Sequence, residues 1–220
     1  MAHRAEEKER RRQERIAQEE AARKAAARKR TLQVGGGVVL GLAVIAVVAI
    51  VALAGGGGGK DKTADVSKLT TDAKAAGCTF SQFKSEGRTH TASKVTYKTN
   101  PPTSGNHNPT PADDGIYRAG NSPPKENFVH SLEHGRIEFQ YKPGTPAADV
   151  ARLRRLAEEP FNGNAGYHIL MFENNTKMPD QFAATAWTKS ISCPTLSTQA
   201  IGAMREFRDA FTDKGPEFIP

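Results

Sequence analysis

The sequence predicts an α+β (or α/β) domain in which a small mixed sheet packs against two or three helices, preceded by a single transmembrane helix. Three observations lead to this prediction. Residues 32–54 form a long run without any charge, which has the length of a membrane span. Residues 136–172 read as strand, helix and strand in succession, and residues 198–211 carry apolar side chains at helical spacing. Alternating strand and helix patterns of this kind favour a sheet covered by helices.

The chain of 220 residues divides into four segments by composition. Residues 1–31 form a charged helical tail, and residues 32–54 form the predicted transmembrane helix. Residues 55–63 contain five consecutive glycines and read as a flexible tether. Residues 64–220 remain as the folded domain, and they are enough to bury a core.

Charge is placed unevenly, and this predicts the orientation of the anchor. Residues 1–30 hold eleven Lys/Arg and six Asp/Glu, which accounts for +5 of the formal net charge of +7. Because Arg28, Lys29 and Arg30 adjoin the apolar run, the positive-inside rule puts the N-terminus in the cytoplasm. We therefore expect a single-pass cell-membrane protein with an uncleaved anchor and an extracytoplasmic domain. This asymmetry also argues against a nucleic-acid partner.

Gly37 and Gly41 lie four residues apart within the predicted span. Such a pair lets two membrane helices approach closely, so it is a weak indication of dimerisation. The sequence identifies no other protein partner.

Several secondary-structure elements can be predicted from periodicity. Residues 64–76 suggest a short helix and residues 89–97 a strand. Residues 136–142 alternate as a half-buried strand, a helix opens at Thr145-Pro146 and ends at Pro160, and residues 167–172 form the next strand. A strand, a helix and a strand in this order favour a crossover that joins parallel strands.

The two cysteines, Cys78 and Cys193, are 115 positions apart and have neither finger nor CxxC spacing. Outside the cytosol, an even number of cysteines favours a disulfide. We therefore predict one disulfide that ties the start of the domain to its last third; the alternative is two unrelated buried thiols.

Residues 130–134, His-Ser-Leu-Glu-His, match the inverted zincin motif H-x-x-E-H. In that motif His130 and His134 would hold zinc and Glu133 would act as the base. Pro123-Pro124 upstream and Gly135 downstream leave room for only one or two helical turns. The competing interpretation is that both histidines satisfy hydrogen bonds in a loop before a strand.

Two further histidines extend this candidate site. His107 lies in a loop at 100–109 whose prolines fix much of the backbone, and His168 lies at the start of the predicted strand at 167–172. We predict that His107, His130, His134 and His168 can meet as metal ligands. Since imidazole suits zinc and copper, one of these metals is the expected cofactor.

Several phrases of the sequence resemble the membrane-anchored bacterial and archaeal family called domain of unknown function 3105. The resemblance covers roughly residues 75–217. The phrases that carry it are PPTSGNH at 101–107, DGIY at 114–117, HSLEHG at 130–135, TAW at 185–187 and RDAFTDKGPE at 208–217. The resemblance implies a single-span anchor with an exported domain, and it implies no particular activity, substrate or catalytic residue.

Three functions remain open from the sequence. The first is an exported domain that binds a transition metal through a histidine cluster. The second is a zinc-dependent hydrolase that uses the H-x-x-E-H stretch with Glu133 as base. The third is a structural or partner-binding envelope protein without a small-molecule site. The distances between the histidine side chains distinguish the three.

Overall fold

The computed structural model describes residues 66–217 and residue 219. The predicted tail, transmembrane helix, glycine tether and Gly37/Gly41 pair lie outside these described residues. Within them, no helix is both long enough and apolar enough to cross a membrane. The described residues belong to one compact unit.

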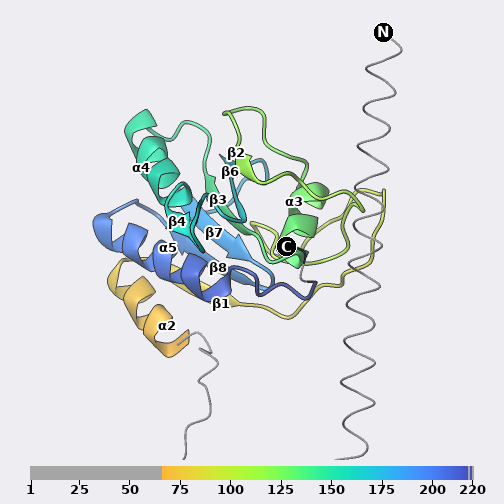
Figure 1. Ribbon diagram of the computed structural model, residues 1–220, viewed down its shortest axis with the longest axis horizontal. Coiled ribbons are helices and arrows are strands. Elements are labelled where there is room, and N and C mark those ends of the chain that lie inside the picture. The colour runs from red at the N-terminus through yellow and green to blue at the C-terminus, as the bar shows by residue number, and fades with distance from the viewer. Residues whose placement is uncertain (1–65, 218, 220) are drawn as a thin grey trace, which may run out of the picture. The chain divides into compact units, whose positions relative to one another are not determined.

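The fold is mixed α+β, with four helices and a six-stranded sheet among the described residues (Figure 1). The helices are α2 (Val66–Ala75), α3 (Lys125–Glu133), α4 (Ala147–Ala157) and α5 (Thr198–Phe211). The strands of the sheet are β1 (Thr79–Gln82), β2 (Gly115–Ile116), β3 (Ile137–Tyr141), β6 (Ile169–Glu173), β7 (Phe182–Ala186) and β8 (Lys189–Cys193). Two short strands, β4 (Pro160–Phe161) and β5 (Asn164–Ala165), pair only with each other.

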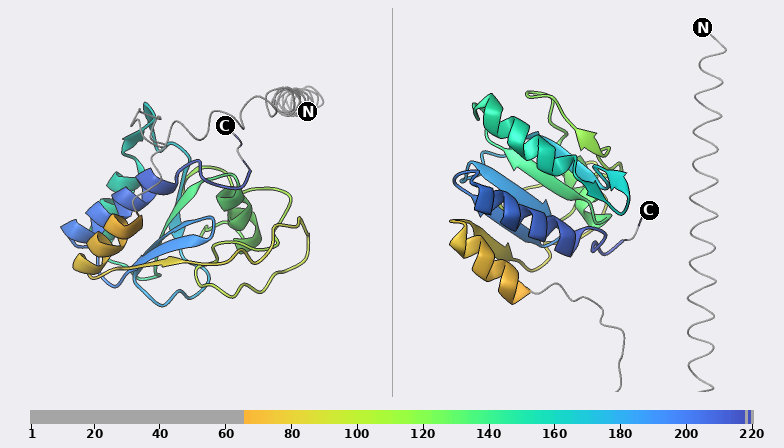
Figure 2. Two further views of the ribbon diagram at one scale, coloured as in Figure 1. Left: turned by 90° about the horizontal axis from the view of Figure 1, so that it is seen from below. Right: turned by 60° about the vertical axis from the view of Figure 1, so that its left-hand side comes forward.

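The strand order in the sheet is β1-β8-β7-β3-β6-β2. The β3–β6 and β6–β2 pairs are parallel, and the other pairs are antiparallel, so the sheet is mixed as predicted. Helices α2, α4 and α5 cover one face, and α3 lies on the other (Figure 2). Four helices therefore pack on the sheet, where two or three were expected.

Most of the predicted elements agree with the structure. Helix α4 joins the parallel strands β3 and β6, and α5 spans the predicted residues 198–211. The prediction of a strand at 89–97 is wrong, because this polar segment contributes only an isolated bridge between His90 and His107. Strands β7 and β8, which are not among the elements predicted above, form an antiparallel hairpin.

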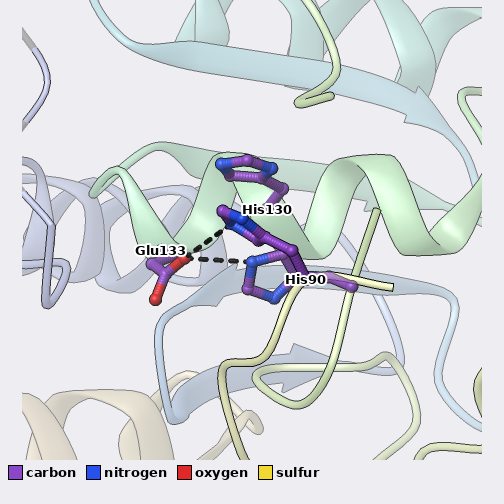
Figure 3. Close-up of side chains that lie close together, drawn as sticks. His90, His130 and Glu133 are labelled. Atoms are coloured by element: carbon purple, nitrogen blue, oxygen red, sulfur yellow. Dashed lines mark ion pairs between the residues drawn. The ribbon is translucent and has the colours of Figure 1, made fainter. Parts of the chain in front are cut away.

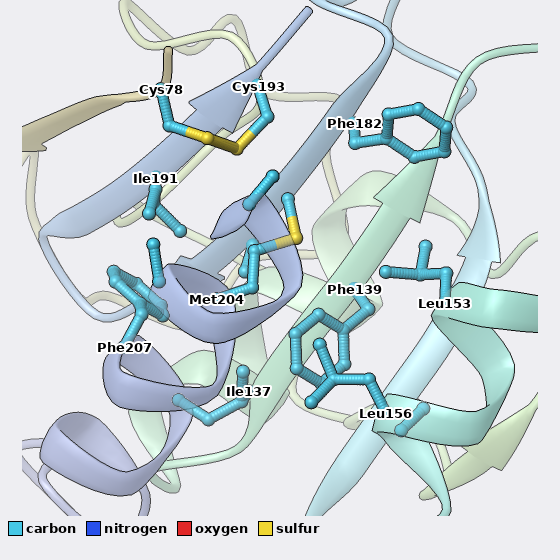
Figure 4. Packing of buried hydrophobic residues seen from close by; sticks show 14 of the residues in the cluster. Cys78, Ile137, Phe139, Leu153, Leu156, Phe182, Ile191, Cys193, Met204 and Phe207 are labelled. Atoms are coloured by element: carbon cyan, nitrogen blue, oxygen red, sulfur yellow. A yellow bond between two sulfur atoms is a disulfide. The ribbon is translucent and has the colours of Figure 1, made fainter. Parts of the chain in front are cut away.

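The main core lies between the sheet and helices α2, α4 and α5 (Figure 4). Successive strand residues point to opposite faces, so Ile137, Phe139 and Tyr141 of β3 enter this core. Cys78 and Cys193 lie at its edge and are joined by a disulfide with an S–S distance of 2.02 Å. The predicted pairing of the two cysteines therefore agrees with the structure.

A smaller core lies under α3, on the other face of the sheet. Phe128, Val129 and Leu132 of α3 pack there against Leu170, Phe172 and Trp187. This core includes a polar network, in which Oε2 of Glu138 accepts hydrogen bonds from Thr185 Oγ1 (2.7 Å) and Gln140 Nε2 (3.0 Å). Glu138 Oε1 is buried without a hydrogen-bond partner. Burial raises the pKa of Glu138 well above its ordinary value, because the charged form has lost its water.

Glu138 gives the fold a pH dependence that Glu138→Gln is expected to remove. A carboxyl whose folded pKa is raised stabilises the fold fully below its unfolded pKa. That stability is lost as the pH rises toward the folded pKa. Above about pH 4.5, the free energy of unfolding of Glu138→Gln should therefore increase relative to that of the unsubstituted chain, by up to about 1.4 kcal/mol per pH unit. Urea unfolding of both proteins from pH 4 to pH 8 measures this gain, and parallel pH profiles would contradict the assignment.

Candidate functional site

The H-x-x-E-H stretch ends helix α3 in a way that the sequence explains. Pro124 stands immediately before the helix. Proline fits at this end because the first turn leaves backbone amides unpaired, and proline has no amide hydrogen. At the other end Gly135 has a φ of +80°, and its amide donates to the carbonyl of Leu132 while that of Arg136 donates to the carbonyl of Ser131. This pair of bonds is the Schellman motif, which requires a residue that tolerates positive φ. The helix has nine residues, slightly more than the one or two turns expected.

His107 belongs to the proline-rich loop at 100–109, and this loop fixes its side chain. It is fully buried, and its Nδ1 lies 2.7 Å from the carbonyl oxygen of Gly105. The indole of Trp187 meets the imidazole edge-on, with 6.1 Å between ring centroids. Gly105 has a φ of +126°, and a Cβ there would lie 2.8 Å from the Tyr97 ring, so the loop needs glycine at this position.

His130 is oriented in the same way by the same loop. Its Nδ1 lies 2.6 Å from the carbonyl oxygen of Asn108. A carbonyl oxygen only accepts hydrogen bonds, so Nδ1 is the protonated nitrogen in both His130 and His107. With Nδ1 so occupied, Nε2 is the ring nitrogen that can bind a metal in each residue, and that of His130 also lies 2.9 Å from Nε2 of His134. Metal-bound histidines are commonly fixed by this kind of bond from the second ring nitrogen.

Four side chains converge at this point: His90, His107, His130 and Glu133. One donor atom from each lies within 4.8 Å of every other donor atom. Figure 3 shows His90 from the preceding loop directed toward His130 and Glu133 of α3. Three of the four are buried, whereas the His90 side chain is 47 % exposed. The group therefore opens to solvent on the His90 side.

His107 and Glu133 are in direct contact within this group. Nε2 of His107 lies 3.0 Å from Oε2 of Glu133. The same nitrogen is buried and makes no hydrogen bond. A lone pair and a carboxylate oxygen repel each other at this distance unless a proton or a cation lies between them. The arrangement is thus suited to a positive ion.

His134 adjoins the group without belonging to it. Its Nε2 lies 2.9 Å from Nε2 of His130, and Oε2 of Glu217 is 3.9 Å away on its other side. Burial lowers the pKa of His134 to about 3 and that of His130 to about 4, with smaller contributions from the neighbouring histidines. Both imidazoles are therefore neutral at pH 7, the form that binds metals.

The structure separates His168 from the other three predicted metal ligands. His168 precedes β6, and its Nδ1 pairs with Oδ1 of Asp213 at 2.6 Å. It is absent from the group of four donors, in which His90 is present instead. The sequence does not mark His90 as a ligand, because in the predicted strand at 89–97 this histidine has no special position. The parallel bridge between His90 and His107 is the feature that brings it in.

The C-terminal segment, residues 212–217, lies against the end of α3. The amide of Asp213 donates to the carbonyl of Gly135, and that of Glu217 donates to the carbonyl of Glu133. A Cβ on Gly215 would lie 2.1 Å from the Glu133 carbonyl oxygen, so the two backbones are in direct contact. This C-terminal segment therefore supports the backbone that carries Glu133.

Comparison with known proteins gives one match. Residues 89–218, more than half of the chain, match the family described as "Protein of unknown function (DUF3105)". The matched region includes all four donors of the group and His134. No curated protein and no solved structure matches the chain.

Proposed function

Because the chain belongs to the family described as protein of unknown function DUF3105, whose description names no activity, we propose a function from the site itself. The domain binds one transition-metal ion, zinc or copper, through His90, His107, His130 and Glu133. The observation that carries the proposal is the buried Nε2 of His107, which lacks a hydrogen-bond partner and faces a carboxylate oxygen at 3.0 Å.

The chemistry of the donors supports this choice of metal. Imidazole nitrogens and a carboxylate oxygen suit zinc and copper, and zinc binds both at about 2.0–2.2 Å. Donors on one such ion lie closer together than 4.8 Å, so the group must contract when the ion binds. His90, the exposed member, has the most freedom to move.

We further propose that the domain is displayed outside the cell membrane by the apolar run at 32–54. Its uncharged length and the basic residues before it support this orientation. The disulfide between Cys78 and Cys193 also suits an oxidising compartment.

Metal binding is tested with the full chain, purified and equilibrated with Zn²⁺ or Cu²⁺. His107→Ala and His130→Ala are each expected to lower metal affinity by more than about 100-fold, since even outer-shell partners of ligands are worth about 10–100-fold. His168→Asn is the matched control, because it removes a buried histidine outside the group while asparagine tolerates the positive φ and keeps a donor for Asp213. Metal content by mass spectrometry and affinity by competition with a chelator provide the readout. Equal metal in all four proteins would end the proposal.

The zinc hydrolase is the second candidate, favoured by the literal H-x-x-E-H pattern and by the 2.9 Å between Nε2 of His130 and Nε2 of His134. It needs Glu133 as a base outside the ligand set, whereas the Glu133 carboxylate belongs to the group of donors. Glu133→Gln, added to the same experiment, separates the two. We expect it to weaken metal binding; retained metal together with lost peptide or ester cleavage would favour the hydrolase instead.

A further inference from the structure

The four proposed ligands are not held equally firmly. His107 and His130 are buried, and each is anchored by a bond from Nδ1 to a backbone carbonyl. Glu133 is 2 % exposed and is carried by α3. These three form a rigid half of the site, fixed before any ion arrives.

His90 is the exposed member of the group, and its ring stacks on that of His130 with 4.7 Å between ring centroids. Its side chain is 47 % exposed, and it lies outside regular secondary structure, in a single isolated bridge to His107. Its closest charged contact is Oε2 of Glu133, at 3.8 Å. An ion bound by the other three ligands would therefore exchange its fourth position most readily on the His90 side. Sites with three firm protein ligands and one exchangeable position are those that take up outside molecules.

Arg88 lies beside that exchangeable position. Its Nε is 3.5 Å from Oε1 of Glu133, and its side chain is 62 % exposed. If Glu133 binds a cation, the carboxylate charge is shared with the ion. The exposed guanidinium of Arg88 then remains beside the site. Guanidinium groups bind carboxylates and phosphates through paired hydrogen bonds.

We propose that the metal ion carries an exchangeable position on the His90 side, and that an external oxyanion, a carboxylate or a phosphate group, binds there beside Arg88. This inference rests on the proposed metal site and names the class of ligand that the site takes. One oxygen of the oxyanion would bind the metal in place of the His90 imidazole, which moves toward solvent, and the oxyanion would accept hydrogen bonds from Arg88. No covalent bond is broken in this step.

Cobalt is a suitable probe, because the visible absorption of Co²⁺ reports its coordination number. The full chain is loaded with Co²⁺ and titrated separately with sodium acetate and inorganic phosphate, which distinguishes a carboxylate from a phosphate source. We expect the absorption to change and to saturate with at least one anion. Arg88→Gln is expected to lower the affinity for that anion about tenfold while leaving cobalt bound. Arg155→Gln, which alters an exposed arginine on α4, is the control and should leave anion affinity unchanged.

His90→Ala provides an independent check on the exchangeable position. We expect this variant to keep cobalt with reduced affinity and to bind added imidazole in the vacated place. A cobalt spectrum that responds to neither anion would overturn the inference while leaving the metal site intact. Equal anion binding by Arg88→Gln and Arg155→Gln would also overturn it. Failure of the unsubstituted chain to load any metal would instead overturn the proposed function.

Discussion

Gly215→Ala is expected to destabilise the domain by about 2–4 kcal/mol, which is the upper range for a side chain forced into packed structure. The added Cβ would lie 2.1 Å from the carbonyl oxygen of Glu133 and 2.3 Å from the amide nitrogen of Gly135. Both are backbone atoms at the end of α3, so neither can rotate away. The C-terminal segment would have to leave α3, and Glu133 would lose the support of its backbone. Urea unfolding measures the loss of stability, and the chelator competition measures the accompanying loss of metal affinity.

Gly202→Ala is the matched control for this substitution. Gly202 lies within α5, where a Cβ would meet nothing within 4 Å. Because glycine is a poor helix former, the same change there is expected to stabilise the domain by up to about 1 kcal/mol. A Gly215→Ala variant as stable as the unsubstituted chain would show that the C-terminal segment does not pack against α3 as described.

Removal of the disulfide by Cys78→Ala together with Cys193→Ala is expected to cost about 4–5 kcal/mol. The two cysteines are 115 positions apart, and the restriction of the unfolded chain grows with the length of the closed loop. For a domain of this size such a loss corresponds to a decrease in Tm of roughly 10–20 °C. Thermal unfolding of the full chain with and without the two substitutions measures it.

Reduction of the unsubstituted chain provides the control for packing, because it breaks the disulfide without removing either sulfur. If constraint of the unfolded chain is the cause, the reduced chain and the double variant should unfold at similar temperatures. Trapping of free thiols in intact cells, before lysis, should leave both cysteines unlabelled if the domain is exported. An unchanged Tm after reduction would remove the disulfide as a source of stability.

The fold could largely be predicted wherever one periodicity dominates. The residues of α5 repeat at helical spacing along their whole length, and β3 alternates without interruption, so the sequence predicts both elements. Residues 89–97 contain β-branched side chains, but apolar and polar residues do not alternate along the segment. Backbone contacts with the 100–109 loop, rather than a partner strand, decide their conformation. Such contacts between distant polar segments leave no periodic signal.

The residues of the candidate site also differ in whether a local sequence pattern marks them or only a distant contact brings them in. The sequence predicts His107, His130 and Glu133 as site residues, because a proline-rich loop and a short motif mark them. His90 was missed, since its role comes from the bridge to His107 across many intervening residues. His168 can meet the others only if its strand neighbours residues 136–142. The strands are neighbours, since β3 pairs with β6, but His168 lies just before β6 with a φ of +53° and pairs with Asp213.

The contact between Gly215 and α3 also affects the order in which the domain can mature. The donors at 90–133 are synthesised well before residues 212–217, whose backbone amides complete the hydrogen bonding at the end of α3. A nascent chain in which residues 212–217 have not yet packed against α3 therefore carries the histidines without that support. If the proposed site binds a metal, tight binding is accordingly expected only after residues 212–217 have been synthesised and have packed against α3.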